Sequence, residues 1–431
     1  MTSAFPVGHT DRDALRAEVS RRLQQEAIDG SDAGRDDVVD RLITDVLRER
    51  DLAELAARRP PLSAQVEQSL RQSLRDSFLG LGGLQPYIDD PDVENIDVNG
   101  ANTVFVSYAG ELPVQVPPIA SSDDELIDML QTLARRSGAQ ERRFDPGMPR
   151  LDLQLPDGSR LFATMAVTER VCVSIRRHRF PRLSLSDLAE LGTISREMVD
   201  LFGALVAARC NIVVSGGMDT GKTTMARALC REFEPWERII TIEDPYELGL
   251  HRDTKAHPNV VAMQPREPNI EGQGGIDMTT LVRWATRMRP DHVVVGEVRG
   301  GEVIPLLNAF NQGTDGSLTT IHASSTRDAW MKIASYARQA PEQLPFDVTF
   351  QLIGGGVDIV VQVGKSTDGR RFVTGIREVV DADATQVRSN EIYRPGPHRN
   401  AVLTGRFSDT MVDRLFEVGY DPQSLDVRRP A

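Results

Sequence analysis

Between residues 191 and 380 the chain alternates short apolar runs with segments whose apolar residues recur at helical spacing. The apolar runs that predict strands are 211–215, 239–243, 292–297 and 317–322. Runs that are apolar throughout are typical of strands covered on both faces, so this alternation predicts a mostly parallel sheet between two helix layers. Two further runs, 358–363 and 372–379, predict an antiparallel pair that ends the region.

Residues 81–180 have the pattern of a smaller α/β domain. Residues 96–100 and 103–107 predict two strands around an Asn-Gly turn, and residues 123–136 predict a helix with acidic residues in its first turn. Three more strands are predicted over 151–155, 161–167 and 171–176. The polar stretch 181–190 then predicts a linker.

The two ends of the chain differ from these regions. Residues 1–80 are charged, with apolar residues at helical spacing, and predict a helical arm that Pro60-Pro61 interrupts. Residues 396–431 are rich in Pro, Arg and Asn and predict a surface tail. The predicted fold is therefore α/β, with a helical arm, an α/β domain at 81–180, a linker and a larger α/β domain at 191–395.

Charge and composition exclude several classes of protein. The chain has 50 basic and 63 acidic residues, a formal net charge of −13, which argues against a protein that coats nucleic acid. Three scattered cysteines indicate neither a disulfide framework nor a zinc site. Charged residues interrupt the N-terminus before any signal-peptide core, and no apolar run reaches the roughly 18 residues of a spanning helix. We therefore expect a cytoplasmic protein that reaches a membrane only through partners.

The strongest motif matches G-x-x-x-x-G-K-[ST], between an apolar strand and a helix. The residues predicted to bind phosphate are Gly216, Gly217, Met218, Asp219, Thr220, Gly221, Lys222, Thr223 and Thr224. Glycines let backbone N–H groups surround an anion, the lysine reaches the β- and γ-phosphates, and the Thr223 hydroxyl is suited to Mg²⁺. The motif predicts nucleotide binding. Asp219 must face away from the phosphates or weaken their binding.

Acidic residues at two predicted strand ends are candidates for catalysis. Glu243 and Glu297 each follow an apolar strand, and ligands of open α/β sheets bind beside such carboxyl ends. The pattern does not decide which of them is the base and which holds the metal. His322 ends another strand and is a candidate phosphate contact.

Arginines are candidates for stabilising a transferring phosphoryl group. Arg287, Arg289 and Arg299 flank the strand that carries Glu297. A second group, in the upstream domain, consists of Arg160, Arg170, Arg176 and Arg177.

The order of these motifs resembles the type II/type IV secretion ATPase superfamily, most of all its tight-adherence (CpaF-type, or Tad) pilus branch. The upstream blocks with this resemblance are Leu81-Gly82-Gly83-Leu84-Gln85-Pro86, Asp97-Val98-Asn99-Gly100, Leu155-Pro156-Asp157-Gly158-Ser159-Arg160 and Ser174-Ile175-Arg176-Arg177. The downstream blocks resemble the family's Asp box at 241–248, its atypical Walker B at 287–302 and its His box at 313–323. The resemblance covers residues 80 to 380.

The resemblance implies a homo-hexameric ATPase with ATP and Mg²⁺ as cofactors. It implies a PAS-like N-terminal α/β domain joined to a RecA-like motor, with Glu297 as general base and Glu243 supporting Mg²⁺ and water. Arg160, Arg176 and Arg177 would reach the phosphates, and turnover would drive an inner-membrane platform protein in pilus assembly or protein secretion. The zinc-binding cysteine pairs of the type II secretion and pilus-extension relatives are absent, which argues against that branch and for no zinc, and we expect no direct binding of nucleic acid.

Two alternatives stay open, and the second of them rests on two departures from the family pattern. The chain has Thr314 where relatives commonly carry histidine, and Met218-Asp219-Thr220 replaces small loop residues. One alternative is a conjugation-type ATPase that moves DNA or a DNA–protein complex. The other is a nucleotide-binding scaffold with little hydrolysis.

Overall fold

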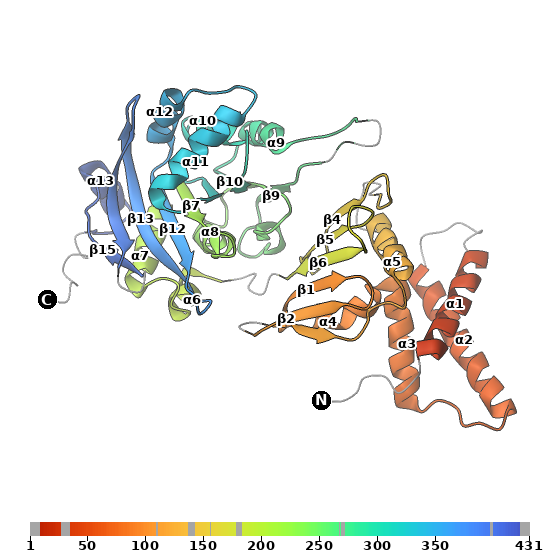
Figure 1. Ribbon diagram of the computed structural model, residues 1–431. Helices are drawn as coiled ribbons and strands as arrows, with labels where there is room; N and C mark the ends of the chain where they lie inside the picture. The colour runs from red at the N-terminus through yellow and green to blue at the C-terminus, as the bar shows by residue number, and fades with distance from the viewer. Residues whose placement is uncertain are drawn as a thin grey trace. The chain divides into compact units, whose positions relative to one another are not determined.

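The protein consists of two units, Met1–Arg179 and Phe180–Ala431 (Figure 1). The computed structural model describes residues 9–26, 35–108, 111–136, 143–155, 157–177, 183–266, 268, 272–396 and 400–422. None of the helices in these ranges is both long and apolar enough to cross a bilayer.

Unit 1 begins with three helices, α1 (His9–Glu26), α2 (Arg35–Ala56) and α3 (Ala64–Leu79). They bury their own apolar core, in which Val19, Ile43 and Leu74 are fully enclosed. The predicted helical arm is confirmed, and its predicted interruption at Pro60-Pro61 falls between α2 and α3. The Ser63 hydroxyl caps α3 by accepting a hydrogen bond from the Val66 N–H.

The rest of unit 1 is an antiparallel sheet with the strand order β3-β2-β1-β6-β5-β4. The strands are β1 (Val93–Asn99), β2 (Val104–Tyr108), β3 (Val114–Val116), β4 (Arg150–Gln154), β5 (Arg160–Thr164) and β6 (Cys172–Arg176). The short helices η2 (Gly82–Leu84) and α4 (Gln85–Asp89) precede the sheet, and α5 (Asp123–Arg136) follows β3. Leu126 and Leu130 of α5 share a buried core with Ile96 and Val98 of β1. The predicted strands and helix are all present.

Unit 2 contains a nine-stranded sheet with the order β15-β14-β13-β12-β7-β11-β10-β8-β9. The strands are β7 (Ile212–Gly216), β8 (Ile239–Ile242), β9 (Val260–Met263), β10 (His292–Val298), β11 (Leu318–His322), β12 (Ile359–Lys365), β13 (Arg371–Ala382), β14 (Val387–Pro395) and β15 (Ala401–Leu403). From β12 to β9 all neighbours are parallel, whereas β12 to β15 pair antiparallel. The predicted parallel sheet is confirmed, and β9, β14 and β15 are additions to it.

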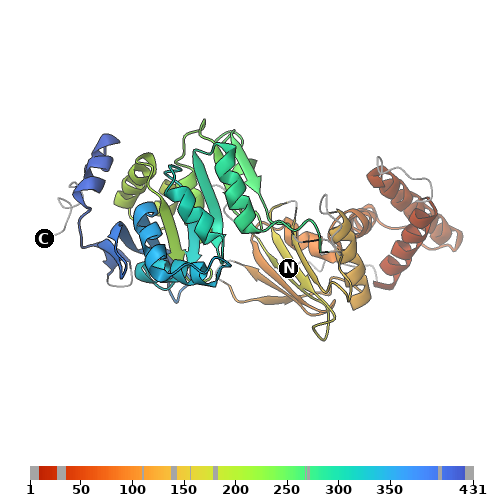
Figure 2. The ribbon, with the colours of Figure 1, turned by 90° about the horizontal axis from the view of Figure 1, so that it is seen from above.

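Helices cover both faces of this sheet (Figures 1 and 2). One core contains residues of α6 (Leu185–Glu190), α7 (Arg196–Ala207), α8 (Lys222–Cys230) and α13 (Asp409–Glu417). The other contains residues of α9 (Met278–Ala285), α10 (Val303–Phe310), α11 (Thr326–Gln339) and α12 (Phe346–Gly356). On β7, Ile212 and Val214 point into the first core and Val213 into the second, since alternate side chains leave opposite faces of a strand.

Two segments differ from their predictions. Within 181–190, Leu185–Glu190 forms α6, whose N-terminus has a capping box between Ser184 and Asp187. Within 396–431, α13 buries Met411 and Leu415 in the core of unit 2, because their i, i+4 spacing places both on one helix face. These parts are packed elements and not a linker and a surface tail. Residues 181–182, 397–399 and 423–431 lie outside the described residues.

Candidate nucleotide-binding site

The glycine-rich loop connects the carboxyl end of β7 to the N-terminus of α8. A Cβ on Gly216 would lie 2.6 Å from the Val363 carbonyl oxygen and 2.6 Å from Thr220 Oγ1, so only glycine fits there. Gly221, at φ 92°, is the N-cap of α8 in the left-handed region that favours glycine. The backbone N–H groups of the next residues, Lys222, Thr223 and Thr224, therefore stand at a helix N-terminus, where anions bind.

The carboxylate of Asp219 points away from this cradle. Its Oδ2 accepts a hydrogen bond from Lys365 Nζ at 2.5 Å and its Oδ1 accepts one from Arg371 Nη2 at 2.7 Å. Burial raises the pKa of Asp219, but the hydrogen bonds from Lys365 and Arg371 outweigh it and leave the pKa below its ordinary value. The neighbouring Met218 is 85% exposed, whereas Thr220 is buried and its hydroxyl donates to the Gly217 carbonyl oxygen.

A chain of contacts joins Lys222, at the start of α8, to His322 at the end of β11 and to Glu297 in β10. Lys222 Nζ donates to the Gly217 carbonyl oxygen at 2.8 Å and lies 3.1 Å from His322 Nδ1. His322 Nε2 lies 2.8 Å from Glu297 Oε1. Burial first, and the charge of Lys222 second, lower the pKa of His322 and favour a neutral ring. The predicted strand-end residues Glu297 and His322 are thus in contact with each other and with the loop lysine.

The oxygen Oε1 of Glu297 is buried and lies 2.8 Å from His322 Nε2, which donates to it when the neutral ring carries its proton there. The other oxygen, Oε2, accepts a hydrogen bond from Arg299 Nε at 2.7 Å. A neutral ring that accepts from Lys222 at Nδ1 carries its proton on Nε2, so His322 links the loop lysine to Glu297. Glu297 is therefore held by His322 at one oxygen and by Arg299 at the other, in the wall of a cavity.

A bulge in β10 directs Glu297 to this position. The register between β10 and β11 shifts by one residue between Val295 and Val298. The hydroxyls of Thr319 and Thr320 on β11 donate to the carbonyl oxygens of Val295 and Gly296, at 2.9 and 2.7 Å. The two threonines of the His-box segment thus hold the bulge in place.

Glu243 is enclosed and both of its carboxylate oxygens are occupied. It is 1% exposed, Oε1 accepts a hydrogen bond from the Thr241 hydroxyl, and Oε2 accepts the N–H groups of Glu247 and Leu248 at 2.7 and 2.6 Å. Burial raises the pKa of Glu243, and these hydrogen bonds oppose that rise. This environment organises the turn after β8 at the wall of the cavity described below.

Glu247 is the carboxylate that contacts the predicted metal ligand. The Thr223 hydroxyl donates to Glu247 Oε2 at 3.2 Å. Sequence reasoning missed Glu247 because it lies five residues beyond the end of β8 at Ile242, and only the turn brings it back to the loop. Its position inside the Asp-box segment was the available signal.

A cavity of about 220 Å³ connects these groups. Its lining includes Thr223, Glu243, Asp244, Glu247, Glu297, Arg299 and Glu302. Within the described residues no three His, Cys, Asp or Glu side chains form a preformed metal cage. Mg²⁺ characteristically takes one or two protein oxygens together with phosphates and waters, and the hydroxyl of Thr223 beside Glu247 fits that donor set.

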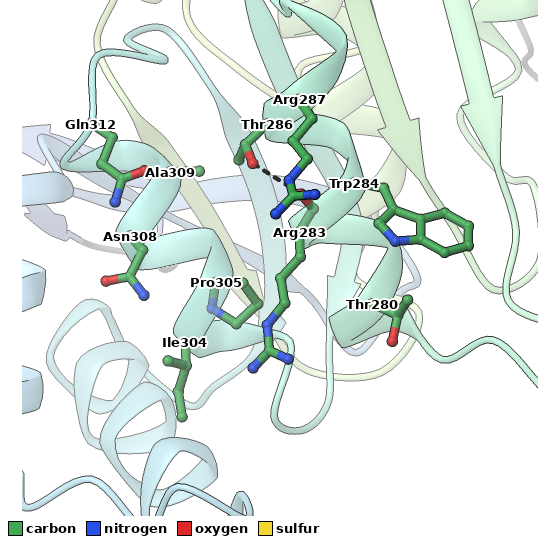
Figure 3. Close-up of a pocket in the computed structure, with 10 residues that line it drawn as sticks. All are labelled: Thr280, Arg283, Trp284, Thr286, Arg287, Ile304, Pro305, Asn308, Ala309 and Gln312. Carbon is green, nitrogen blue, oxygen red and sulfur yellow. Dashed lines mark hydrogen bonds between the residues drawn. The ribbon is translucent and has the colours of Figure 1, made fainter.

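The arginines near Glu297 divide between two places. Arg299 follows β10 and contacts Glu297. Arg287 and Arg289 precede β10, so they lie at the opposite edge of the sheet from Glu297. Arg287 lines a separate hollow of about 490 Å³ between α9 and α10, beside Trp284 (Figure 3). Of these three arginines, Arg299 alone belongs to the candidate site.

The arginines of unit 1 form a group on its sheet. Arg160 of β5 and Arg176 of β6 are paired opposite each other, and Arg160 forms an ion pair with Asp152 at 3.0 Å. Arg177 follows β6, donates to the Asp90 carbonyl oxygen and lies 3.7 Å from Asp157. Arg170 pairs instead with Asp123 at 2.6 Å and so anchors α5 to this sheet.

Thr314 lies away from the glycine-rich loop. It precedes the N-terminal end of β11, which runs parallel to β7, whereas the loop follows the carboxyl end of β7. Its hydroxyl donates to the Ala309 carbonyl oxygen at 2.6 Å and satisfies the end of α10. Thr314 therefore has a structural role at the opposite edge of the sheet.

The fold and the loop define a P-loop protein with a RecA-like domain preceded by a smaller α/β domain. Residues 83–352 match the family described as "Type II/IV secretion system protein", and the chain belongs to that family. The expected membership of this superfamily is confirmed.

Two relatives agree with this membership, and one solved structure shows the same fold. A putative conjugal transfer protein of Mycobacterium tuberculosis is 31% identical over 319 residues, which cover 72% of this chain and 87% of the relative. The type IV secretion system protein VirB11 of Brucella suis is 30% identical over 311 residues, which cover 65% of this chain and 83% of the relative. The X-ray structure of the ATPase DotB of Legionella pneumophila has the same fold, with a TM-score of 0.51 at 17% identity, over 80% of this chain and 84% of that one.

Proposed function

We propose that this protein is an ATPase that binds ATP with Mg²⁺ and hydrolyses it to power transport. The supporting observation is the position of Glu297, which lines the same cavity as Thr223 and is joined to Lys222 through His322. A carboxylate in this position is suited to accept a proton from an attacking water. We assign Glu297 as the general base. We assign His322 as the side chain that links Glu297 to the loop lysine, Lys222.

The other residues have roles that follow from their contacts. The loop from Gly216 to Thr224 would hold the phosphates, and Thr223 with Glu247 would hold Mg²⁺, which neutralises charge that develops on the phosphates. Glu243 positions Glu247 through its backbone hydrogen bond and is not itself a metal ligand in this proposal. Arg299 orients Glu297 by binding its second oxygen.

We retain Arg160, Arg176 and Arg177 as proposed phosphate contacts, on the strength of the family resemblance alone. Neutralising substitutions of Arg160 and Arg176 would lower kcat if these arginines stabilise the transferring group. Arg135, an exposed arginine of α5, is the matched control for the loss of a positive charge.

Magnesium-dependent ATPase activity of the purified full chain tests the proposal. Glu297→Gln should lower kcat by roughly 10²–10⁴-fold with nucleotide binding retained. Lys222→Ala should abolish nucleotide binding, and the exposed Glu190→Gln should match the wild type. Wild-type turnover no higher than that of Glu297→Gln would support the nucleotide-binding scaffold instead.

We further propose a cytoplasmic homo-hexamer that docks on an inner-membrane platform protein and drives pilus assembly or protein secretion, as in the CpaF-type branch. The net charge of −13 supports a protein cargo over DNA. Conjugal DNA transfer is the second candidate, because the names of several relatives describe it. A chromosomal Glu297→Gln allele separates the two: loss of surface pili or secreted protein supports the first, and loss of DNA transfer alone supports the second.

The hexamer has its own test in the mass of the protein in solution. With a non-hydrolysable ATP analogue and Mg²⁺, we expect six times the chain mass of 47.6 kDa. A protein that stays monomeric with bound analogue would refute the ring.

A further inference from the structure

One residue of the glycine-rich loop is held by a distant hairpin. Asp219 accepts hydrogen bonds from Lys365 and Arg371, and Arg371 Nε also donates to the backbone carbonyl oxygen of Asp219 at 3.0 Å. Three contacts from one hairpin thus converge on a single loop residue. Asp219 itself has a φ of 55°, in the left-handed region that aspartate adopts more readily than most residues.

Sheet topology brings the hairpin to the loop. Lys365 is the last residue of β12 and Arg371 is the first of β13, and the two are paired across the hairpin. Strand β12 is the parallel neighbour of β7, with Val363 paired to Gly216 where the loop begins. The chain beyond Val363 therefore extends over the loop, and a Cβ on Gly221 would lie 3.2 Å from Arg371 Cδ.

The contacts also settle the charge of the loop. Without partners, the Asp219 carboxylate would repel the polyanion for which the loop is built. With Lys365 and Arg371 beside it, one negative and two positive side chains leave a local formal charge of +1. The side chains of all three are 36–42% exposed, so solvent weakens this effect without removing it.

We propose that Lys365 and Arg371 are positioning residues which bind the Asp219 carboxylate and keep its charge off the bound phosphates. We call Asp219, Lys365 and Arg371 the loop latch. The inference rests on the proposed nucleotide binding. It makes the β12–β13 hairpin part of the nucleotide site although neither cation needs to touch the nucleotide.

The test measures the affinity of the full chain for a fluorescent ATP analogue with Mg²⁺. Lys365→Ala/Arg371→Ala should bind about tenfold more weakly, since it releases an ionised carboxylate beside the phosphates. Lys332→Ala/Arg370→Ala removes the same charge without touching the loop, because Arg370 pairs with Asp368, and should bind like the wild type.

Removing the carboxylate gives the decisive variant. Asp219→Gly, added to Lys365→Ala/Arg371→Ala, should restore the affinity to within about threefold of the wild type, because glycine tolerates the positive φ and carries no charge. A latch that only supported the fold would give no such recovery, so an unrestored triple variant overturns the proposal. Latch variants that bind like the wild type also overturn it.

Lys222→Ala distinguishes failure of the latch from failure of the proposed function. If the wild type binds no more tightly than Lys222→Ala, the site is not a nucleotide site and both proposals fall. If the wild type binds more tightly than Lys222→Ala but the latch variants bind equally well, only the latch is wrong.

Discussion

Glu243 holds the turn after β8, and we predict that its removal destabilises that turn. It is 1% exposed and accepts three hydrogen bonds, from the Thr241 hydroxyl and from the N–H groups of Glu247 and Leu248. Glu243→Ala removes the acceptor of all three hydrogen bonds. It leaves the N–H groups of Glu247 and Leu248 without this partner. Each orphaned donor costs about 1–3 kcal/mol.

The net cost is smaller than the sum of these terms. Burial raises the pKa of Glu243, because the buried carboxylate is desolvated. Removing the carboxylate also removes this unfavourable desolvation, which offsets part of the free energy lost with the three hydrogen bonds. We therefore expect Glu243→Ala to lower the local free energy of opening by about 3 kcal/mol. Glu243→Gln keeps an oxygen that accepts from both amides and gains an NH₂ group that donates to the Thr241 hydroxyl oxygen, so its cost should stay below about 1 kcal/mol.

Amide hydrogen exchange measured on peptides that contain Glu247 and Leu248 reports this opening directly. Glu243→Ala should speed their exchange roughly a hundredfold, since 1.4 kcal/mol corresponds to a factor of ten. Glu243→Gln should speed it less than about tenfold. If these amides exchange at the wild-type rate in Glu243→Ala, Glu243 does not position the turn. Glu243→Gln with unchanged exchange but abolished turnover would return Glu243 to the role of metal support.

Three further predictions concern other parts of the site. Thr320→Val removes the hydroxyl that holds the β10 bulge, so kcat should fall about tenfold with nucleotide affinity unchanged; a parallel loss of affinity would contradict this. Gly216→Ala brings a Cβ within 2.6 Å of backbone and should lower the thermal midpoint by about 5 °C, whereas in Gly217→Ala the nearest atom is 3.6 Å away and the midpoint should hold. The lowered native pKa of His322 means that the unfolded chain binds its proton more readily, so stability should fall as pH drops below the ordinary value of 6.5. This fall in stability below pH 6.5 should be missing in His322→Asn. If the thermal midpoints of the wild type and His322→Asn change with pH in the same way, the prediction is wrong.

Local features of the fold could be predicted because they need only neighbouring residues. The apolar runs of β7, β8, β10 and β11 predict buried parallel strands, and the glycine-rich loop follows from spacing alone. Residues Glu297 and His322 could be placed at one edge because parallel strands share their carboxyl ends. The prediction failed for α13, since a composition rich in Pro and Arg concealed a short helix with only two fully buried apolar positions, Met411 and Leu415.

The sequence by itself therefore determined the phosphate-binding loop, the parallel sheet and the strand ends that carry candidate acids. Only the tertiary structure decided what each acid contacts: Glu243 binds the turn, Glu247 returns to Thr223, and Glu297 contacts His322 and Arg299. It also paired Asp219 with Lys365, 146 residues away. Hydrogen-bond partners depend on where the chain folds back on itself, and no local pattern of residues records that.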